Sequence, residues 1–204
     1  MASAAVWLWL LFGVLSLGLR SVLHRRRTGK TGLLGVSGRP GSIEWLAGVG
    51  FAVAIGLGVA APLLALWDVV EPIGALDTTL AHVLGLVCYG AGLLAVLHAQ
   101  GAMGESWRVG VDPSERTELV MHGPFSVVRN PIFTAMVATV LGLSLMVPSV
   151  VALASVAMLS ISLEVQVRLV EEPYLMRVHH ASYPAYAGRV GRFLPGLGRL
   201  KQEL

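Results

Sequence analysis

The chain has 204 residues, of which 55% are hydrophobic and only 13% are charged. Soluble domains carry about 25% charged residues, so the composition and a mean hydropathy of +0.72 indicate a chain that lies largely in lipid. The formal net charge of +3 comes from cations that border apolar runs, which favours a role in membrane topology over nucleic-acid binding. A single cysteine, Cys88, excludes a disulfide within the chain and a cysteine metal cluster.

Five apolar runs predict membrane helices, since a bilayer core needs about 20 apolar residues in helical form. They cover residues 4–19, 43–66, 79–99, 131–147 and 149–163. A basic cluster follows the first run and none precedes it, which indicates a retained helix rather than a secretory signal. The last two runs are short and meet at Pro148-Ser149, which predicts a helical hairpin.

The basic residues predict the topology. All 15 Lys and Arg residues fall within residues 20–39, 108–129 and 168–201, whereas the connection between the second and third runs carries only Asp68, Glu71 and Asp77. With five crossings, all three basic segments lie on one side, and the positive-inside rule makes that side cytoplasmic. We therefore predict an all-α integral protein of the bacterial inner membrane, with its N-terminus outside and a cytoplasmic C-terminal helical segment.

Two short motifs precede the fourth run, Gly123-Pro124-Phe125 and Arg129-Asn130-Pro131. A structural interpretation makes Asn130 a side-chain N-cap and Pro131 the first helical residue, with Arg129 reaching the membrane surface. A functional interpretation has free N–H groups at this helix start that bind a charged ligand. Because Asn130 is the only Asn in the chain, we retain the functional interpretation.

A second polar group follows the fifth run at spacings of three or four residues, which predicts one helix face. Its members are Glu164, Arg168, Glu171, Glu172, Leu175 and His179. An ion pair between Glu164 and Arg168 is the structural interpretation of the first two, although an ionisable residue at membrane depth is also a functional candidate. The adjacent carboxylates of Glu171 and Glu172 repel each other unless a cation lies beside them, so we predict a cationic ligand there.

Two tyrosines and then two arginines occur at intervals of three residues near the C-terminus, at Tyr183, Tyr186, Arg189 and Arg192, before Pro195. Taken alone, this pattern is more typical of an interfacial belt than of a site that orients a carboxylate. In the third run, Gly90 and Gly92 permit close approach of a helix or a ligand, with packing the commoner reason. Gln100 borders the same run. His179-His180 has no supporting ligand spacing, so we predict no metal site.

Together, the motifs of the second half resemble the isoprenylcysteine carboxyl methyltransferase family and the related phospholipid methyltransferases. The resemblance covers about residues 85–198 and rests on an ordered set: Gly123-Pro124-Phe125, Arg129-Asn130-Pro131, Phe133, Glu171-Glu172, Leu175, Tyr183, Tyr186, Arg189, Arg192 and Pro195. It implies an S-adenosylmethionine-dependent membrane methyltransferase whose lipophilic or lipidated substrate enters from the bilayer. On this basis we divide the chain into an N-terminal two-helix region, 1–76, and a methyltransferase-like core, 77–204.

The resemblance also implies a cofactor site on the cytoplasmic side. Its predicted cofactor-binding residues are Gly90, Gly92, Gln100, Gly123, Pro124, Phe125, Arg129, Asn130, Pro131, Phe133, Glu171 and Glu172. Glu172, Tyr186, Arg189 and Arg192 are the predicted catalytic residues. We expect Arg129 to bind the cofactor's carboxylate, Arg189 or Arg192 to hold an acidic substrate, and Glu172→Gln to weaken cofactor binding without loss of the fold.

The chain departs from the family pattern at three positions: Asn130 replaces a histidine, and Phe125 and Phe133 replace tyrosines. Asn130 retains hydrogen bonding but cannot take up a proton near neutral pH. A carboxylate acceptor is favoured because it needs no general base, whereas an amine acceptor would need one, such as Glu164 or Glu172. The alternatives are an NADPH-dependent reductase of the sterol-reductase type and a non-enzymatic membrane scaffold. The sequence predicts neither the methyl acceptor nor the oligomeric state.

Overall fold

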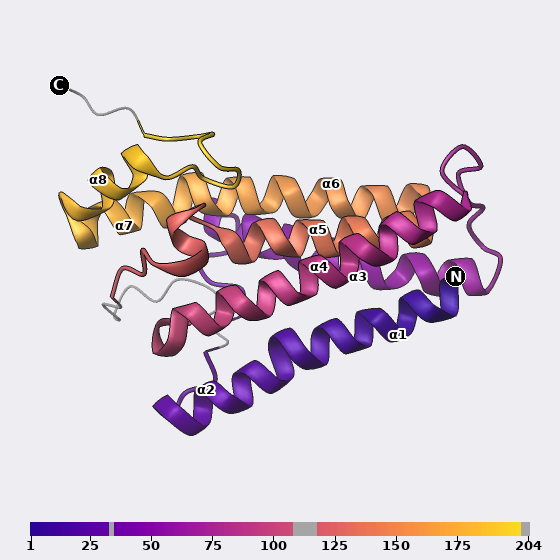
Figure 1. Ribbon diagram of the computed structural model, residues 1–204, viewed down its shortest axis with the longest axis horizontal. Helices are drawn as coiled ribbons and strands as arrows, with labels where there is room; N and C mark the ends of the chain where they lie inside the picture. Colours follow the sequence, from indigo (N-terminus) through magenta and orange to yellow (C-terminus); the bar gives the residue numbers. More distant parts are fainter. Residues whose placement is uncertain (33–34, 108–117, 201–204) are drawn as a thin grey trace.

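The protein is described by a computed structural model that covers residues 1–32, 35–107 and 118–200. Within these ranges every regular element is a helix, and the only strand-like feature is an isolated parallel bridge between Val128 and Gly191. The helices lie side by side as a bundle (Figure 1). The predicted all-α fold is therefore confirmed, while Arg108 and Arg116 of the second basic segment lie outside the described residues.

The first three apolar runs form long helices. α1 (Ala2–Gly13), the π-helical segment η1 (Val14–Leu19) and α2 (Arg20–Thr28) form one continuous helix, which ends at Gly29 in a left-handed conformation. Ser42 is the N-cap of α3 (Ile43–Leu66), and Thr78 is the N-cap of α4 (Thr79–Met103). Both side chains accept a hydrogen bond from a backbone N–H of the first turn. A 3₁₀ turn, η2 (Gly104–Ser106), ends α4.

The second half of the chain is a hairpin with an extended helical arm. A 3₁₀ turn, η3 (Gly123–Ser126), precedes α5 (Pro131–Met146), and α6 (Val150–Val165) returns along the bundle. The helix continues through the π-helical segment η4 (Gln166–Glu171) into α7 (Glu172–His179), and α8 (Ser182–Arg189) follows. Pro148 and Ser149 form the apex, where the Ser149 hydroxyl accepts the N–H of Ala152 at 3.2 Å, so the predicted hairpin is confirmed.

Within the described residues, four helices are long and apolar enough to cross a membrane: Ala2–Thr28, Ile43–Leu66, Thr79–Ser106 and Val150–His179. The fourth predicted span, α5, has 16 residues and is shorter than these. At 1.5 Å per residue it is about 24 Å long, against a bilayer core of about 30 Å. The hairpin apex nevertheless reaches the connection between α3 and α4, where the N–H of Ile73 donates to the Pro148 carbonyl at 2.8 Å.

The bundle is held together by one apolar core to which α1, α3, α4, α5 and α6 all contribute. α4 packs along α5 and α3 along α6, while α1 covers α3 and part of α5. Leu159 and Val96 are completely buried at the centre of this core. Side chains from both predicted regions, 1–76 and 77–204, therefore share one core, and their division remains a prediction.

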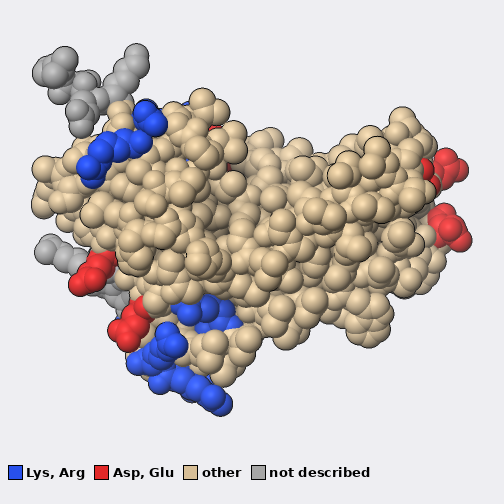
Figure 2. Space-filling model, viewed as in Figure 1, with Lys and Arg blue, Asp and Glu red and all other residues tan. Residues whose placement is uncertain are grey.

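The basic residues gather at one end of the bundle. The basic residues at the end of α2 lie at the same end as α7 and α8, and the connection between α3 and α4 lies at the opposite end with the N-terminus (Figure 1). On the face drawn in Figure 2, the Lys and Arg atoms gather at the first of these ends, whereas acidic atoms lie at both ends. The folded chain thus brings its described basic segments to one end, as the sequence predicts.

We predict that Gly92→Ala lowers the free energy of unfolding by about 1–3 kcal/mol, the usual effect of overpacking. A methyl group at Gly92 would lie 2.8 Å from the backbone nitrogen of Thr139 and 2.9 Å from the carbonyl oxygen of Ala135, so α4 and α5 would have to separate. Unfolding in mixed detergent micelles measures the change. Gly101→Ala, also in α4 but facing open space, is the control, and an equal effect of both substitutions would contradict this packing role.

Candidate functional site

The start of α5 is paired with the C-terminal segment. The N–H groups of Arg129 and Asn130 donate to the carbonyl oxygens of Gly191 and Arg192 at 2.8 and 3.1 Å. Asn130 occupies the N-cap position, but its side chain makes no capping bond and instead donates to the Arg192 carbonyl at 3.0 Å. The predicted side-chain cap is therefore wrong, although Pro131 is the first residue of the helix as expected. These two N–H groups also already have protein partners.

The Arg129 side chain donates hydrogen bonds to four residues that follow α6 in the chain. Its side chain is 2% exposed, and Nη1 donates to the carbonyl oxygens of Ala187 and Val190, both at 2.8 Å. Nη2 donates to Oε1 of Glu172 at 2.6 Å and to the Gly198 carbonyl at 3.1 Å. The expectation that Arg129 reaches the membrane surface is wrong. Its terminal nitrogens are already engaged, so binding the cofactor's carboxylate would require it to exchange partners.

Glu172 is buried between two arginines. Besides Arg129, it accepts a bidentate pair from Arg192, with Nε to Oε1 at 2.7 Å and Nη2 to Oε2 at 2.9 Å. A carboxylate is removed from water here only because two guanidinium groups satisfy both of its oxygens. The cation that the acidic pair requires is therefore supplied by the protein, and the inference from repulsion to a cationic ligand is wrong. Whether Glu171 and Glu172 also contact the cofactor remains a prediction.

The members of the expected polar face along α6 and α7 differ in burial. Glu164 and Arg168 make the predicted i,i+4 ion pair at 2.5 Å, and both side chains are about half exposed. The π-helical segment η4 then changes the helical phase, so Glu172 turns into the protein. The ion-pair interpretation is confirmed, and that Glu164 and Glu172 share one face remains a prediction.

The two tyrosines of α8 pack inside the protein rather than forming a belt. Tyr183 and Tyr186 are 2% and 3% exposed, and their rings meet edge to face with 6.3 Å between centroids. The Tyr186 hydroxyl donates to the Phe125 carbonyl at 2.5 Å, which ties α8 to the η3 turn. Burial raises the pKa of Tyr186 to about 12, so this hydroxyl stays protonated at neutral pH. Arg189, by contrast, ends α8 with an exposed side chain.

One network therefore contains many of the predicted site residues. It joins Phe125, Arg129, Asn130, Glu172, Tyr186 and Arg192 through the contacts given above. Gly123 adopts a positive φ of 58° at the start of the turn that carries Pro124 and Phe125. Glu171 accepts a hydrogen bond from Gln166 at 3.4 Å, and Phe133 is half-buried on α5.

The predicted residues of α4 lie outside this network. Gly92 contacts α5, which confirms the packing interpretation, whereas a methyl group at Gly90 would meet open space. Gln100 is 3% exposed and donates to the Ser16 carbonyl of η1 at 2.9 Å.

This contact leads to a polar cluster that the sequence analysis did not identify. Arg20 donates to the Gly104 carbonyl at 2.6 Å, and its guanidinium lies over the Trp107 ring, 5.2 Å from the centroid. His24 packs edge to face on the same ring at 5.6 Å. Ser16, Arg20 and His24 are spaced by four residues, which predicts that they share one helix face. This spacing could have revealed the cluster, but Arg20 was interpreted only as a determinant of membrane topology.

We predict that Glu172→Gln destabilises the protein instead of leaving the fold intact. The substitution leaves two buried guanidinium groups without their counterion, and breaking a buried pair of this kind costs about 3–5 kcal/mol. Unfolding in detergent, combined with protease sensitivity of residues 182–200, measures the effect. The control is Glu164→Gln, which removes the exposed pair with Arg168 and should cost about 0.5 kcal/mol or less. Equal stability of the parent and Glu172→Gln would contradict a structural role for Glu172.

Comparison with known proteins identifies the family. A family model described as Phospholipid methyltransferase matches residues 80–182, just over half of the chain, from α4 to the start of α8. The match includes the η3 turn, the Arg129-Asn130-Pro131 motif and Glu172, and it ends before Tyr183, Tyr186, Arg189, Arg192 and Pro195. Neither the curated proteins nor the solved structures give a match. The chain therefore belongs to the phospholipid methyltransferase family of membrane proteins.

Proposed function

We propose that this protein transfers the methyl group of S-adenosylmethionine to a lipophilic substrate at the cytoplasmic face of the membrane. The observation that carries the proposal is the convergence of Phe125, Arg129, Glu172 and Arg192 at the basic end of the bundle. The first three lie within the stretch matched by the methyltransferase family. Methyltransferases of this kind need a preorganised cofactor site, and a network of buried hydrogen bonds supplies rigidity.

Methyl transfer suits a site built from positioning groups. S-Adenosylmethionine supplies an activated methyl group, so the protein has to orient two reactants and exclude water. In our proposal, the pairing of α5 with the C-terminal segment holds the η3 turn beside the cofactor. Gln100 fits the cofactor's ammonium group, because its buried Oε1 has no hydrogen-bond partner within the described residues. Arg189, exposed at the end of α8, is the proposed contact for an acidic substrate group.

A carboxylate remains the favoured methyl acceptor. An amine acceptor would need a general base, and Glu172 already accepts hydrogen bonds from two guanidinium groups, which makes its carboxylate a weak base. Glu164 pairs with Arg168, which also makes its carboxylate a weaker base. A carboxylate is ionised at neutral pH and needs no base. This argument supports a substrate of the isoprenylcysteine carboxyl methyltransferase type within the broader family.

The reductase alternative is less well supported. NADPH carries three phosphates and is typically bound by several free arginines, whereas Arg129 and Arg192 are both engaged by Glu172. The family match also favours methyl transfer. A scaffold without catalytic activity remains the non-enzymatic alternative, and a ligand-binding experiment separates it from both enzymes.

We predict that the purified protein binds S-adenosylmethionine or its demethylated product with a Kd in the micromolar range, the common range for working enzymes. Calorimetry in a neutral detergent measures this binding, with NADPH titrated in parallel. Transfer of a labelled methyl group is then assayed with a prenylated cysteine, a fatty acid and an ethanolamine phospholipid. A base-labile methyl ester is the expected product. An N-methylated lipid would contradict the carboxylate acceptor, and binding of NADPH alone would contradict the methyltransferase.

We propose five crossings, with the N-terminus outside and the C-terminal segment in the cytoplasm. The hairpin apex reaches the end of the bundle that carries the connection between α3 and α4, which supports a crossing by α5 despite its length. In a Cys88→Ala background in sealed vesicles, Glu71→Cys should react with an impermeant reagent added outside. Arg27→Cys and Leu197→Cys should be protected. Labelling of Arg27→Cys from outside would contradict this topology.

A further inference from the structure

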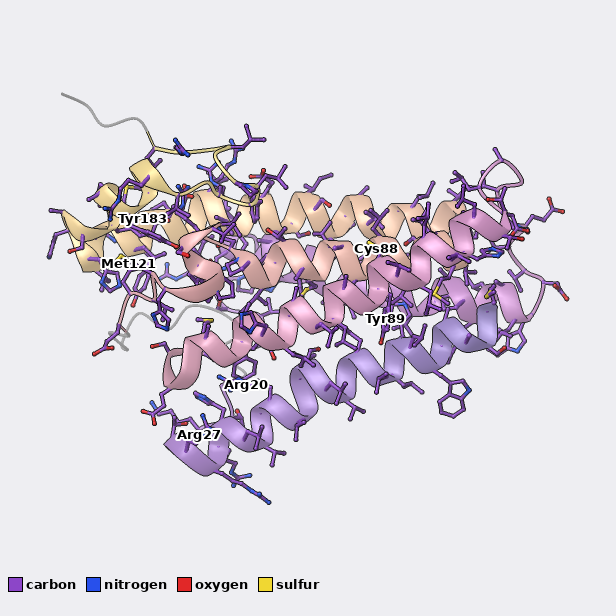
Figure 3. The ribbon with its side chains drawn as sticks, viewed as in Figure 1. Arg20, Arg27, Cys88, Tyr89, Met121 and Tyr183 are labelled. Carbon is purple, nitrogen blue, oxygen red and sulfur yellow. The ribbon has the colours of Figure 1, made fainter. Side chains whose placement is uncertain are left out.

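Arg20 is a buried cation with no acidic partner among the described residues. It lies between the first helix and α4 (Figure 3), is 9% exposed, and uses Nη2 to donate to the Gly104 carbonyl. Trp107, 2% exposed, covers its guanidinium. Nε of Arg20 has no hydrogen-bond partner in the part of the chain that the structure describes. A charged group inside a membrane helix bundle is expensive, and one without a counterion is typical of a binding site.

Gln100 presents the complementary atom one helical turn away. Its Nε2 donates to the Ser16 carbonyl, so the amide orientation is determined and Oε1 is left as a buried acceptor without a partner. The π-helical segment η1 makes this contact possible, because the N–H of Arg20 donates to Leu17 instead of Ser16. Among the described residues, Arg20 therefore offers an unpartnered donor and Gln100 an unpartnered acceptor, and the buried Ser21 hydroxyl beside Arg20 also has no partner.

Arg20 and Gln100 lie on neighbouring turns of the same helix–helix interface. The hydrogen bond between Gln100 and Ser16 lies on one turn, and the bond between Arg20 and Gly104 lies four residues further along both helices. The two bonds are therefore about one helical turn, 5.4 Å, apart. A donor that carries positive charge matches an anionic oxygen, and an amide oxygen matches an ammonium group. A ligand that satisfies both atoms therefore carries an anion and an ammonium group a few atoms apart.

We propose that Arg20 and Gln100 form a subsite for a zwitterionic group, with the anion on Arg20 and the ammonium on Gln100. Two sources have this chemistry: the amino-acid part of the cofactor and the head group of an ethanolamine phospholipid. The cofactor source rests on the proposed use of S-adenosylmethionine. Either way, the Trp107 ring shifts as the ligand enters, because it lies over the guanidinium. The subsite extends the site to a helix that lies outside the matched family region.

A pair of ligands tests the cofactor source. S-Adenosylhomocysteine carries the amino-acid part, and methylthioadenosine lacks it while retaining the adenosine and the sulfur. In a neutral detergent, the parent protein should prefer the first ligand by at least about tenfold. Arg20→Gln should remove this preference and leave the affinity for methylthioadenosine unchanged. The matched control is Arg27→Gln, an exposed arginine two turns further along the same helix, which should retain the preference.

A second pair of ligands tests the lipid source. Native mass spectrometry compares retention of an ethanolamine phospholipid with that of a neutral diacylglycerol. Loss of this preference in Arg20→Gln, with the cofactor preference intact, assigns the subsite to the head group. Gln100→Leu repeats both comparisons if Arg20→Gln fails to fold.

Retention of both preferences in the folded variants would overturn the subsite. A parent that binds neither adenosyl ligand would instead contradict the proposed function, and the lipid comparison alone would then decide the inference.

Discussion

The buried carboxylate of Glu172 is the interaction on which the end of the bundle depends. Two guanidinium groups, from Arg129 and Arg192, satisfy both of its oxygens, and the three residues come from three separate segments of the chain. An isolated buried charge costs far more than a pair, so none of the three side chains is stable in this position without the others. The triad therefore holds the helix after η4, the start of α5 and the C-terminal segment in one arrangement.

Backbone contacts around the triad extend the same constraint. The N–H groups of Arg129 and Asn130 pair with the C-terminal segment, and Tyr186 ties α8 to the carbonyl oxygen of Phe125. The bond from the Asn130 N–H uses one of the polar groups that a helix start normally leaves open to water or a ligand. Among the described residues, buried groups without a hydrogen-bond partner remain both in this network, at Nε of Arg129, and near the first helix, at Oε1 of Gln100.

Both π-helical segments occur where a helix leaves the apolar core and acquires polar contacts. η1 precedes Arg20 and makes the Ser16 carbonyl a partner for Gln100, while η4 precedes Glu172 and turns it toward the arginines. An extra residue in a helical turn changes the phase of every side chain that follows. Two helices that cross the membrane with lipid-facing apolar surfaces can therefore direct charged side chains inward at one end.

The sequence alone determined the helical class, the apolar runs, the hairpin apex at Pro148 and the gathering of basic residues at one end. Lipid requires long apolar helices and excludes most charges, so hydropathy and charge position carry this information directly. The family resemblance also predicts site roles for Arg129, Glu172, Tyr186 and Arg192. Only the tertiary structure decided that Arg129 and Arg192 bind Glu172, that Tyr186 binds the Phe125 carbonyl, and that Arg20 and Gln100 lie in one interface between two helices. Those contacts depend on helical phase and on residues far apart in the chain, which local spacing does not encode.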